Sequence, residues 1–204
     1  MGVVKKIRCP RCDTPAVGDR GGLCPECGVV LDLIMDLTAV PSLAEIRQRA
    51  DTSIWKWREL LPIQDSAAIV SLGEGYTPLI EAVRLGDRFG IPRLLVKNDG
   101  LLPTGSLKDR VNALAVSRAK EIKARVVATP STGNAAASLA AYAAAGALRC
   151  VVFVPEGTGA AKVAQAKSCG ARVFQVRAPF EGVATLARQA IEQFGWYSTL
   201  SDNP

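Results

Sequence analysis

The chain has 204 residues, of which 49% are hydrophobic and 22% are charged, the balance of a globular protein rather than a disordered one. Its net charge is +6, but Lys and Arg are spread along the chain instead of forming the basic block typical of nucleic-acid binding, and a small phosphorylated substrate suits the charge equally well. Histidine is absent, which excludes Ser-His-Asp and Cys-His triads and every metal site that uses an imidazole.

No stretch of the chain is predicted to cross a membrane. The apolar runs, such as the Ala-rich stretch 135–148, are too short or too weakly apolar to span a bilayer. The first eight residues, Met1–Arg8, lack an apolar core after their basic residues, so they do not resemble a secretory signal. We therefore expect a cytoplasmic protein with neither a membrane nor a nucleic acid as its partner.

Four of the six cysteines lie within the first 28 residues, as two Cys-x-x-Cys pairs. Two such turns can present four thiolates to one Zn²⁺ ion and complete its tetrahedral shell. Two disulfides are the alternative, which a reducing cytoplasm disfavours. The pattern predicts a structural zinc ribbon with Cys9, Cys12, Cys24 and Cys27 as ligands. Cys150 and Cys169 stand alone, and we expect no function for either of them.

The segment that follows the cysteines has a mixed pattern. A short helix is predicted at 42–50, and Pro41 and Pro62 interrupt the rest. Trp55 and Trp57 come just after this helix. We expect them to pack against neighbouring structure rather than to stack on nucleic-acid bases, because no alternation of basic and aromatic residues continues beyond them.

From residue 94 onward, predicted strands alternate with predicted helices. The apolar runs indicate strands at 94–97, which should be buried, and at 125–129, 150–154, 172–176 and 196–199. Helical periodicity indicates helices at 106–123, 134–146, 160–169 and 180–194. This alternation favours a parallel sheet with helices on both faces. The last helix has one apolar stripe, made of Phe180, Val183, Ala184, Ala187, Ile191 and Phe194.

The segment Pro103–Arg110 contains the most informative lysine of the chain. Ser106, with Asp109 three residues later, has the spacing of a capping box that would start a helix. Lys108 would then lie in the first helical turn, where the helix dipole disfavours its ammonium form. An uncharged lysine amine can bind a carbonyl compound covalently. Taken alone, however, Ser-x-Lys is more often a solvated lysine on a helix.

Two further segments make the pattern specific. Ser71–Leu79, with the sequence SLGEGYTPL, precedes the lysine, and Pro130–Ser138, with the sequence PSTGNAAAS, follows it directly after a predicted strand. Together with PTGSLKDR around Lys108, these segments resemble the threonine synthase family in order and spacing. The amino-terminal cysteine pattern resembles the zinc ribbon of several family members. The resemblance covers nearly the whole chain, from Cys9 to about residue 204.

The resemblance implies a pyridoxal 5′-phosphate enzyme of fold type II, present in part. Its zinc ribbon would span residues 1–36, and an N-terminal segment of the large domain would span 37–100. A smaller α/β subdomain that binds the cofactor would span 101–204, with the remainder of the large domain absent. The implied reaction converts O-phosphohomoserine and water to threonine and phosphate, and the full-length enzyme is expected to be a homodimer.

The resemblance also assigns roles to single residues. Lys108 matches the family lysine that holds the cofactor and moves protons, and Asn134 matches the asparagine that bonds the cofactor's 3′ oxygen. The loop that would receive the substrate carboxylate is Ser131, Thr132, Gly133, Asn134 and Ala135. Hydroxyls and free amides at the start of a helix are suited to binding an anion.

The chain departs from the family pattern at three places. Leu107 stands where the family usually has an aromatic residue, and Val111 stands where it usually has glycine. The family's substrate-phosphate segment, of the type Asn-Ser-x-Asn-Pro, is matched only loosely by residues 198–204. Use of the cofactor is therefore better supported by the sequence than a phosphorylated substrate is.

Two other readings remain open. The chain could belong to another pyridoxal-phosphate enzyme of the same fold, such as a serine or threonine dehydratase or a cysteate synthase. It could instead be a zinc-ribbon binding module without catalysis, which the positive charge would suit. That reading leaves Lys108 and the loop at 131–134 unexplained.

Overall fold

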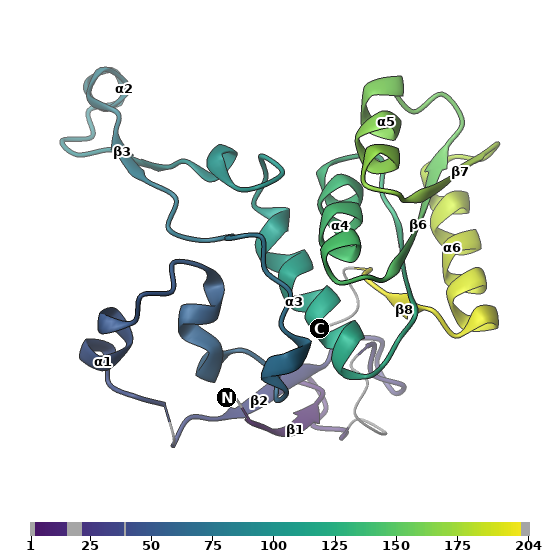
Figure 1. The fold of residues 1–204 in the computed structure, drawn as a ribbon, viewed down its shortest axis with the longest axis horizontal. Helices are drawn as coiled ribbons and strands as arrows, with labels where there is room; N and C mark the ends of the chain where they lie inside the picture. The colour runs from purple at the N-terminus through teal and green to yellow at the C-terminus, as the bar shows by residue number, and fades with distance from the viewer. Residues whose placement is uncertain (1–2, 16–21, 39, 201–204) are drawn as a thin grey trace.

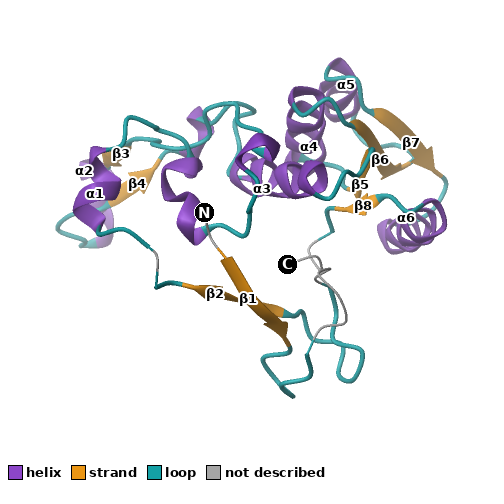
Figure 2. Ribbon diagram, turned by 60° about the horizontal axis from the view of Figure 1, so that its bottom comes forward, coloured by secondary structure: helices purple, strands orange, loops and turns teal. Residues whose placement is uncertain are grey.

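A four-stranded parallel sheet lies at the centre of the C-terminal half of the computed structural model, which describes residues 3–15, 22–38 and 40–200. Its spatial order is β7-β6-β5-β8. The strands are β5 (Val126–Pro130), β6 (Arg149–Pro155), β7 (Arg172–Val176) and β8 (Tyr197–Ser198). The chain therefore builds outward from β5 to β7 and then returns to the other side of β5 with β8 (Figure 2).

Helices cover both faces of this sheet, as the sequence predicts (Figure 1). One face is covered by α4 (Asn134–Ala145) and α5 (Ala160–Ser168), and the other face by α6 (Phe180–Phe194). In addition, α3 (Lys108–Glu121) packs against α4. Alternate residues of each strand enter the two cores, so β5 is buried along its whole length. This double burial explains why its sequence is a continuous apolar run.

The apolar stripe predicted for α6 is only partly buried. Val183 and Ala187 are fully enclosed against the sheet, but Phe180 and Phe194 are 45% and 59% exposed. Both phenylalanines lie at the helix ends, where the sheet no longer covers them. The prediction was therefore wrong for the ends of the stripe, because a periodic pattern does not show how far the partner surface extends.

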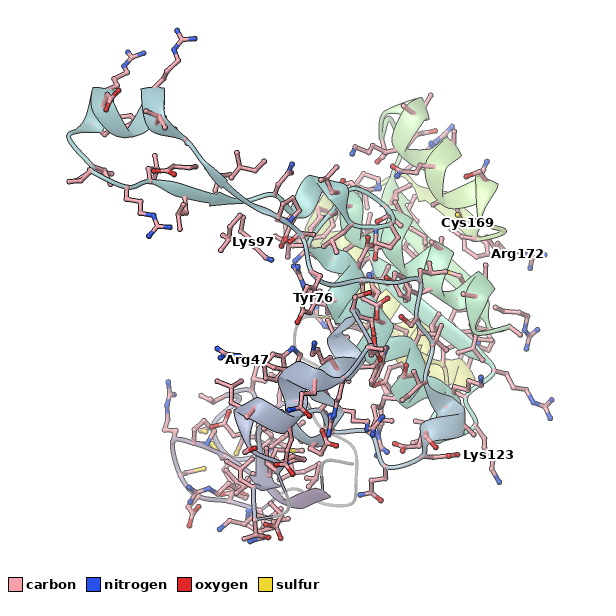
Figure 3. All side chains as sticks on the ribbon, turned by 60° about the vertical axis from the view of Figure 1, so that its left-hand side comes forward. Arg47, Tyr76, Lys97, Lys123, Cys169 and Arg172 are labelled. Carbon is pink, nitrogen blue, oxygen red and sulfur yellow. The ribbon has the colours of Figure 1, made fainter. Side chains whose placement is uncertain are left out.

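The strand predicted as buried at 94–97 is also exposed. It forms β4 (Leu95–Lys97), which pairs antiparallel with β3 (Leu79–Glu81) in a separate two-stranded sheet. Together with α2 (Val83–Phe89), these strands make an arm that stands away from the parallel sheet, with Lys97 near its base (Figures 1 and 3). Leu95 is 40% exposed and Leu79 is 62% exposed. An apolar run indicates a tendency to be buried but does not identify the surface that buries it.

The amino-terminal residues form a small unit with its own core. Strands β1 (Val3–Arg8) and β2 (Asp32–Asp36) pair antiparallel and bring the two cysteine pairs together. Cys9, Cys24 and Leu31 are the buried residues of this core.

Short helices connect this unit to the main core. They are α1 (Leu43–Gln48) and the 3₁₀ segments η1 (Ile54–Leu60) and η2 (Ser66–Ala68). A third 3₁₀ segment, η3 (Asp99–Leu101), lies between β4 and α3. Trp55 is 3% exposed and packs in the main core with residues of α3 and α4, which agrees with a packing role. No helix within the described ranges is both long and apolar enough to cross a membrane.

Candidate functional site

The turn before α3 places Lys108 at the first residue of that helix, with its side chain exposed. Gly105 has a φ of +75°, a left-handed conformation that glycine adopts without strain. The carboxylate of Asp109 is fully buried and accepts hydrogen bonds from the backbone amide of Thr104 at 2.7 Å and from its hydroxyl at 2.5 Å. The side chain of Asp109, a residue of α3 itself, therefore holds the preceding turn in place.

The capping box predicted at Ser106 is not formed. The Ser106 hydroxyl accepts from the amide of Lys108 at 3.3 Å, whereas the Asp109 amide donates to the Ser106 carbonyl. The Asp109 carboxylate bonds Thr104 instead of Ser106, because the left-handed turn brings Thr104 over the start of the helix. The prediction of the capping box was wrong, although Lys108 still lies in the first turn.

An ion pair joins the lysine turn to the first motif, Ser71–Leu79. Arg110 donates to Asp99 at 2.9 Å, and the Thr77 hydroxyl donates to the same carboxylate at 2.7 Å. The hydrogen bond from Arg110, followed by the one from Thr77, lowers the pKa of Asp99 to about 2. Two motifs that lie about thirty residues apart in the sequence are thus held together around one carboxylate.

The same motif is anchored to α4 by a buried carboxylate. Glu74 is fully buried and accepts hydrogen bonds from the Tyr142 hydroxyl at 2.8 Å and from the Leu72 amide at 2.9 Å. Tyr142 is also fully buried, and burial followed by the hydrogen bond to Glu74 raises the pKa of its phenol. Both buried polar groups have hydrogen-bond partners, and their contact fixes the loop relative to α4.

The third motif connects β5 to α4. The Ser131 amide donates to the carbonyl of Phe153 on β6 at 3.2 Å, and the Gly133 amide donates to the Ser131 hydroxyl at 3.3 Å. No side chain caps α4 at Gly133. The first amides of this helix therefore point toward the loop without an intrahelical acceptor, which is an arrangement that favours an anion.

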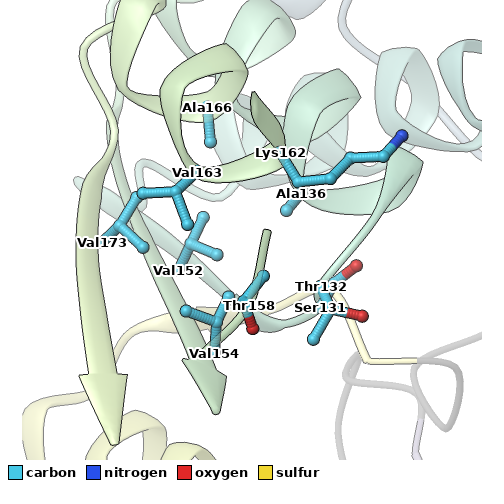
Figure 4. A pocket seen from close by; sticks show the side chains of 10 residues that line it. All are labelled: Ser131, Thr132, Ala136, Val152, Val154, Thr158, Lys162, Val163, Ala166 and Val173. Carbon is cyan, nitrogen blue, oxygen red and sulfur yellow. The ribbon is translucent and has the colours of Figure 1, made fainter. Parts of the chain in front are cut away.

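Lys162 also lies at this edge of the sheet, and the sequence motifs assign it no role. Its ammonium donates to the Oδ1 atom of Asn134 at 3.1 Å, and it lines one small cleft with Ser131 and Thr132. Figure 4 shows the polar atoms of these three cleft residues on one side and valines on the other. The topology could have revealed Lys162, because α4 and α5 both start at the carboxyl edge of the same parallel sheet.

Helix α3, which begins at Lys108, contacts the start of α4. Asn112, one helical turn after Lys108 on the same face of α3, donates to the carbonyl of Ala135 in the first turn of α4 at 3.2 Å. The loop at 131–134 follows β5, at the carboxyl edge where the strand order reverses between β5 and β8. Ligands of open α/β sheets bind at this kind of switch point.

The two departures near the lysine lie on the surface. Leu107 and Val111 are 53% and 57% exposed, so neither is needed to fill the core. Of the loosely matching segment at 198–204, residues 201–204 lie outside the described residues.

The four amino-terminal cysteines form one cluster. Their sulfur atoms all lie within 4.8 Å of one another, and all four are free thiols. Three of the separations are 3.4, 3.5 and 3.7 Å. A tetrahedral Zn²⁺ ion with Zn–S bonds of about 2.3 Å would separate its sulfurs by roughly 3.8 Å, so this donor set fits zinc.

The backbone repeats the same turn at both cysteine pairs. The amide of Cys9 donates to the carbonyl five residues later at 2.9 Å, and the amide of Cys24 does so at 2.8 Å. Asp13 and Gly28 each donate back to the first cysteine of the pair, and both have a positive φ, of 60° and 67°. Two equivalent knuckles therefore face each other.

Of the two remaining cysteines, Cys150 is not suited to nucleophilic chemistry. Cys150 is 5% exposed, and burial followed by the charge of Cys169 raises the pKa of its thiol to about 12. A thiol with this pKa is not ionised near neutral pH.

The fold defines a class of protein, namely an α/β protein with a parallel sheet covered by helices on both faces and an uncapped helix start at the carboxyl edge of that sheet. The sequence profile described as "Pyridoxal-phosphate dependent enzyme" matches residues 70–203. The chain belongs to this family.

Curated relatives are similar over most of the chain. A threonine synthase of Methanocaldococcus jannaschii is 40% identical over 201 residues, which cover 97% of this chain and 49% of that protein. A threonine synthase of Methanosarcina acetivorans is 38% identical over 182 residues, which cover 89% of this chain and 44% of that protein. The chain thus spans about half the length of the curated relatives that it matches.

Solved structures support the fold. The apo diaminopropionate ammonia lyase of Escherichia coli is similar with a TM-score of 0.57 and 21% identity, over 64% of this chain and 41% of that one. The processed threonine deaminase isoform 2 of Solanum lycopersicum is similar with a TM-score of 0.56 and 24% identity, over 61% of this chain and 34% of that one.

Proposed function

We propose that this chain is part of a threonine synthase, a pyridoxal-phosphate-dependent lyase that converts O-phosphohomoserine and water to threonine and phosphate. The observation that supports the proposal is that the helix beginning at Lys108 contacts the uncapped start of α4 through Asn112, in a chain about 40% identical to curated threonine synthases. Because the chain spans about half of those relatives, the reaction is proposed for the whole enzyme.

The residues at this edge suit pyridoxal 5′-phosphate by their donor chemistry. Lys108 offers an amine that no carboxylate pairs within the described ranges, and Asn134 offers an amide. Ser131 and Thr132 offer hydroxyls next to the free amides of α4. When bound, the cofactor would supply the electron sink that lets protons leave the α- and β-carbons of an amino acid.

Each residue then has a distinct task in the proposed site. The amine of Lys108 would hold the cofactor and move protons, since the chain contains no histidine to do so. The Asn134 amide would help to orient the cofactor. The hydroxyls of Ser131 and Thr132 and the amides of Gly133–Ala135 bind the substrate carboxylate and so orient the α-carbon toward the lysine.

The metal and the assembly are also part of the proposal. Cys9, Cys12, Cys24 and Cys27 would hold one structural Zn²⁺ ion that fixes the ribbon and leaves no coordination position open for chemistry. The whole enzyme would act as a homodimer, which its molar mass in solution would test.

The position of the cofactor can be tested without turnover. After incubation with pyridoxal 5′-phosphate and borohydride reduction, peptide mass analysis should find the adduct on Lys108. Lys108→Ala should remove this adduct, whereas Lys120→Ala, which changes an exposed lysine of the same helix, should keep it. An adduct that persists on Lys97 or Lys162 in the Lys108→Ala variant would show that the site is misplaced.

The substrate is tested separately. Release of phosphate from O-phosphohomoserine is expected of the whole enzyme, whereas release of ammonia from serine or threonine alone would favour a dehydratase. We expect the 204-residue chain by itself to show no measurable turnover, because catalysis requires the cofactor to be held on both sides. Turnover by the 204-residue chain at the rate of a longer natural form would contradict this expectation.

A further inference from the structure

A second cavity lies at the edge of the parallel sheet opposite to Lys108 and its loop. It has a volume of about 330 Å³, which is within the range of small-molecule sites. Its lining residues are Val126, Arg149, Cys150, Val151, Gly170, Arg172, Phe174 and Trp196. They belong to the starts of β5, β6 and β7 and to the residue before β8. The cavity is therefore separate from the loop at 131–134, which follows the carboxyl end of β5.

Strand register places two arginines of the cavity lining on the same face of the sheet. Arg172 pairs with Val151, and Arg149 precedes Val151 by two residues on the neighbouring strand. Residues two apart on a strand point to the same face, so the two arginines are diagonal neighbours with Cα atoms roughly 7–8 Å apart. Both side chains are exposed, and Figure 3 shows Arg172 at the surface.

Neither guanidinium has a carboxylate partner among the residues that the structure describes. Two like charges on neighbouring strands repel each other unless an anion lies between them. Arginine presents a planar fork of donors that matches a phosphate or a carboxylate with two parallel hydrogen bonds. The pair is therefore suited to one bound anionic group.

Aromatic and apolar side chains form the rest of the lining. Phe174 is 42% exposed, so part of its ring is open to the solvent. Trp196 lines the same cavity from the far side of β5 and stacks on Phe194. Val126 and Val151 form a buried apolar floor. Such a surface binds the face of a flat ring.

We propose that this cavity is a binding site for a small flat molecule with one phosphate or carboxylate group, of about the size of a nucleoside monophosphate. The anion binds Arg149 on β6 and Arg172 on β7, and the ring lies over Val126 against Trp196. The site is a regulatory or accessory site rather than part of the cofactor site, because the sheet separates the two edges. The proposal does not depend on the proposed function.

The test uses adenosine 5′-monophosphate as the probe and calorimetry of the 204-residue chain as the measurement. Saturable binding is expected, with adenosine and inorganic phosphate each binding at least tenfold more weakly, since each lacks one half of the interaction. Arg149→Gln and Arg172→Gln should each weaken binding about tenfold, the loss of roughly one charge-assisted hydrogen bond. Arg149→Lys keeps the charge but loses the fork, so it should also weaken binding.

Arg177→Gln is the matched control. Arg177 lies just after the other end of β7, is highly exposed and pairs with Glu156, so the change removes one positive charge far from the cavity. Binding should remain within about twofold of the unchanged chain. In amide NMR spectra of the chain, the Gly170 amide and the Trp196 indole should shift on binding.

Several results would overturn the proposal. One is the absence of saturation in the millimolar range, and another is an equal loss of affinity in Arg177→Gln, which would indicate general charge attraction. Shifts confined to the loop at 131–134 would place the probe at the other edge. Lys108→Ala should leave binding of the probe unchanged, so failure here is distinguishable from failure of the proposed cofactor site.

Discussion

The orientation of the Asn134 amide is set by Lys162. An ammonium group can only donate hydrogen bonds, so its contact at 3.1 Å identifies the acceptor as Oδ1 and leaves the NH₂ group of Asn134 free to donate elsewhere. A donor at this position is what a cofactor with an anionic ring oxygen requires. In the proposed site, Lys162 would therefore act on the cofactor through Asn134.

We predict that Lys162→Met weakens binding of pyridoxal 5′-phosphate about five- to tenfold, because the amide loses the partner that fixes its orientation. Methionine retains most of the side-chain length and removes the charge. The affinity is measured from the absorbance of the bound cofactor. Lys167→Met, which changes another exposed lysine of α5, should leave the affinity unchanged. Equal effects of the two changes would show that Lys162 contributes only general charge.

The cysteine cluster predicts a metal content. Elemental analysis of the purified chain should find about one zinc per chain. Cys12→Ser should lower this content, since a four-sulfur shell then lacks one ligand, whereas Cys169→Ser should not change it. Removal of the metal by a chelator should unfold residues 3–15 and 22–36 locally, because this unit has only a small core of its own. Mass analysis that found the four sulfurs paired as disulfides would rule out the zinc site.

At the scale of an element, the loop of the first motif depends on the close approach of two backbone segments. A Cβ atom added at Gly75 would lie 2.4 Å from the carbonyl oxygen of Thr52 and 2.9 Å from the backbone of Ser53. Neither contact is with the end of a flexible side chain. The glycine therefore allows the loop to lie against the start of η1, where the Ile54 amide donates to the Glu74 carbonyl at 2.8 Å.

We predict that Gly75→Ala destabilises the chain by about 1–3 kcal/mol, because one of the two backbone segments has to move. Urea unfolding followed by circular dichroism measures the change. Gly159→Ala is the matched control, because its added Cβ meets nothing within 4 Å and its φ of −50° suits alanine. Similar stabilities of the two variants would mean that the loop is not in contact with Thr52.

For the remaining elements too, the sequence pattern predicts the secondary structure but not the surface against which each element packs. The sequence predicts β7 and α6 with the bounds that are observed, and the other elements of the parallel sheet within about two residues. It fails for the arm, where β3 and β4 pair with each other and remain exposed. Periodicity reports which residues avoid water, whereas the surface that covers them is decided by chain segments elsewhere.

For the whole molecule, two ion pairs predict how stability depends on pH. Two hydrogen bonds from Arg49, at 2.7 and 2.8 Å, lower the pKa of Glu59 to about 2, and Arg110 has the same effect on Asp99. A carboxyl group whose pKa is lowered by folding contributes stability above its unfolded pKa, near 4, and loses this contribution as the pH falls toward about 2.

We therefore predict that Arg49→Gln lowers the free energy of unfolding by about 1 kcal/mol at neutral pH, with a smaller loss at pH near 2. The measurement is urea unfolding at a series of pH values. Arg47→Gln, which changes an exposed arginine of α1, should leave the pH dependence unchanged. A loss for Arg49→Gln that stays constant down to pH 2 would assign the effect to packing instead of charge.

The sequence by itself determined the local units of this protein. The two cysteine pairs predicted a cluster of four thiolates, and the alternation after residue 94 predicted a parallel sheet with helices on both faces. The three motifs indicated the family, and the family is confirmed. These inferences succeed because spacing and periodicity depend on neighbours in the chain.

Only the tertiary structure decided which distant residues meet. Three side-chain contacts join elements that are distant in the sequence. They are Lys162 with Asn134, Tyr142 with Glu74, and Arg110 with Asp99. The cavity between Arg149, Arg172 and Trp196 likewise exists only because strand order places β8 beside β5 and β7 beside β6. Strand order and register depend on packing over the whole sheet, and no local pattern specifies them.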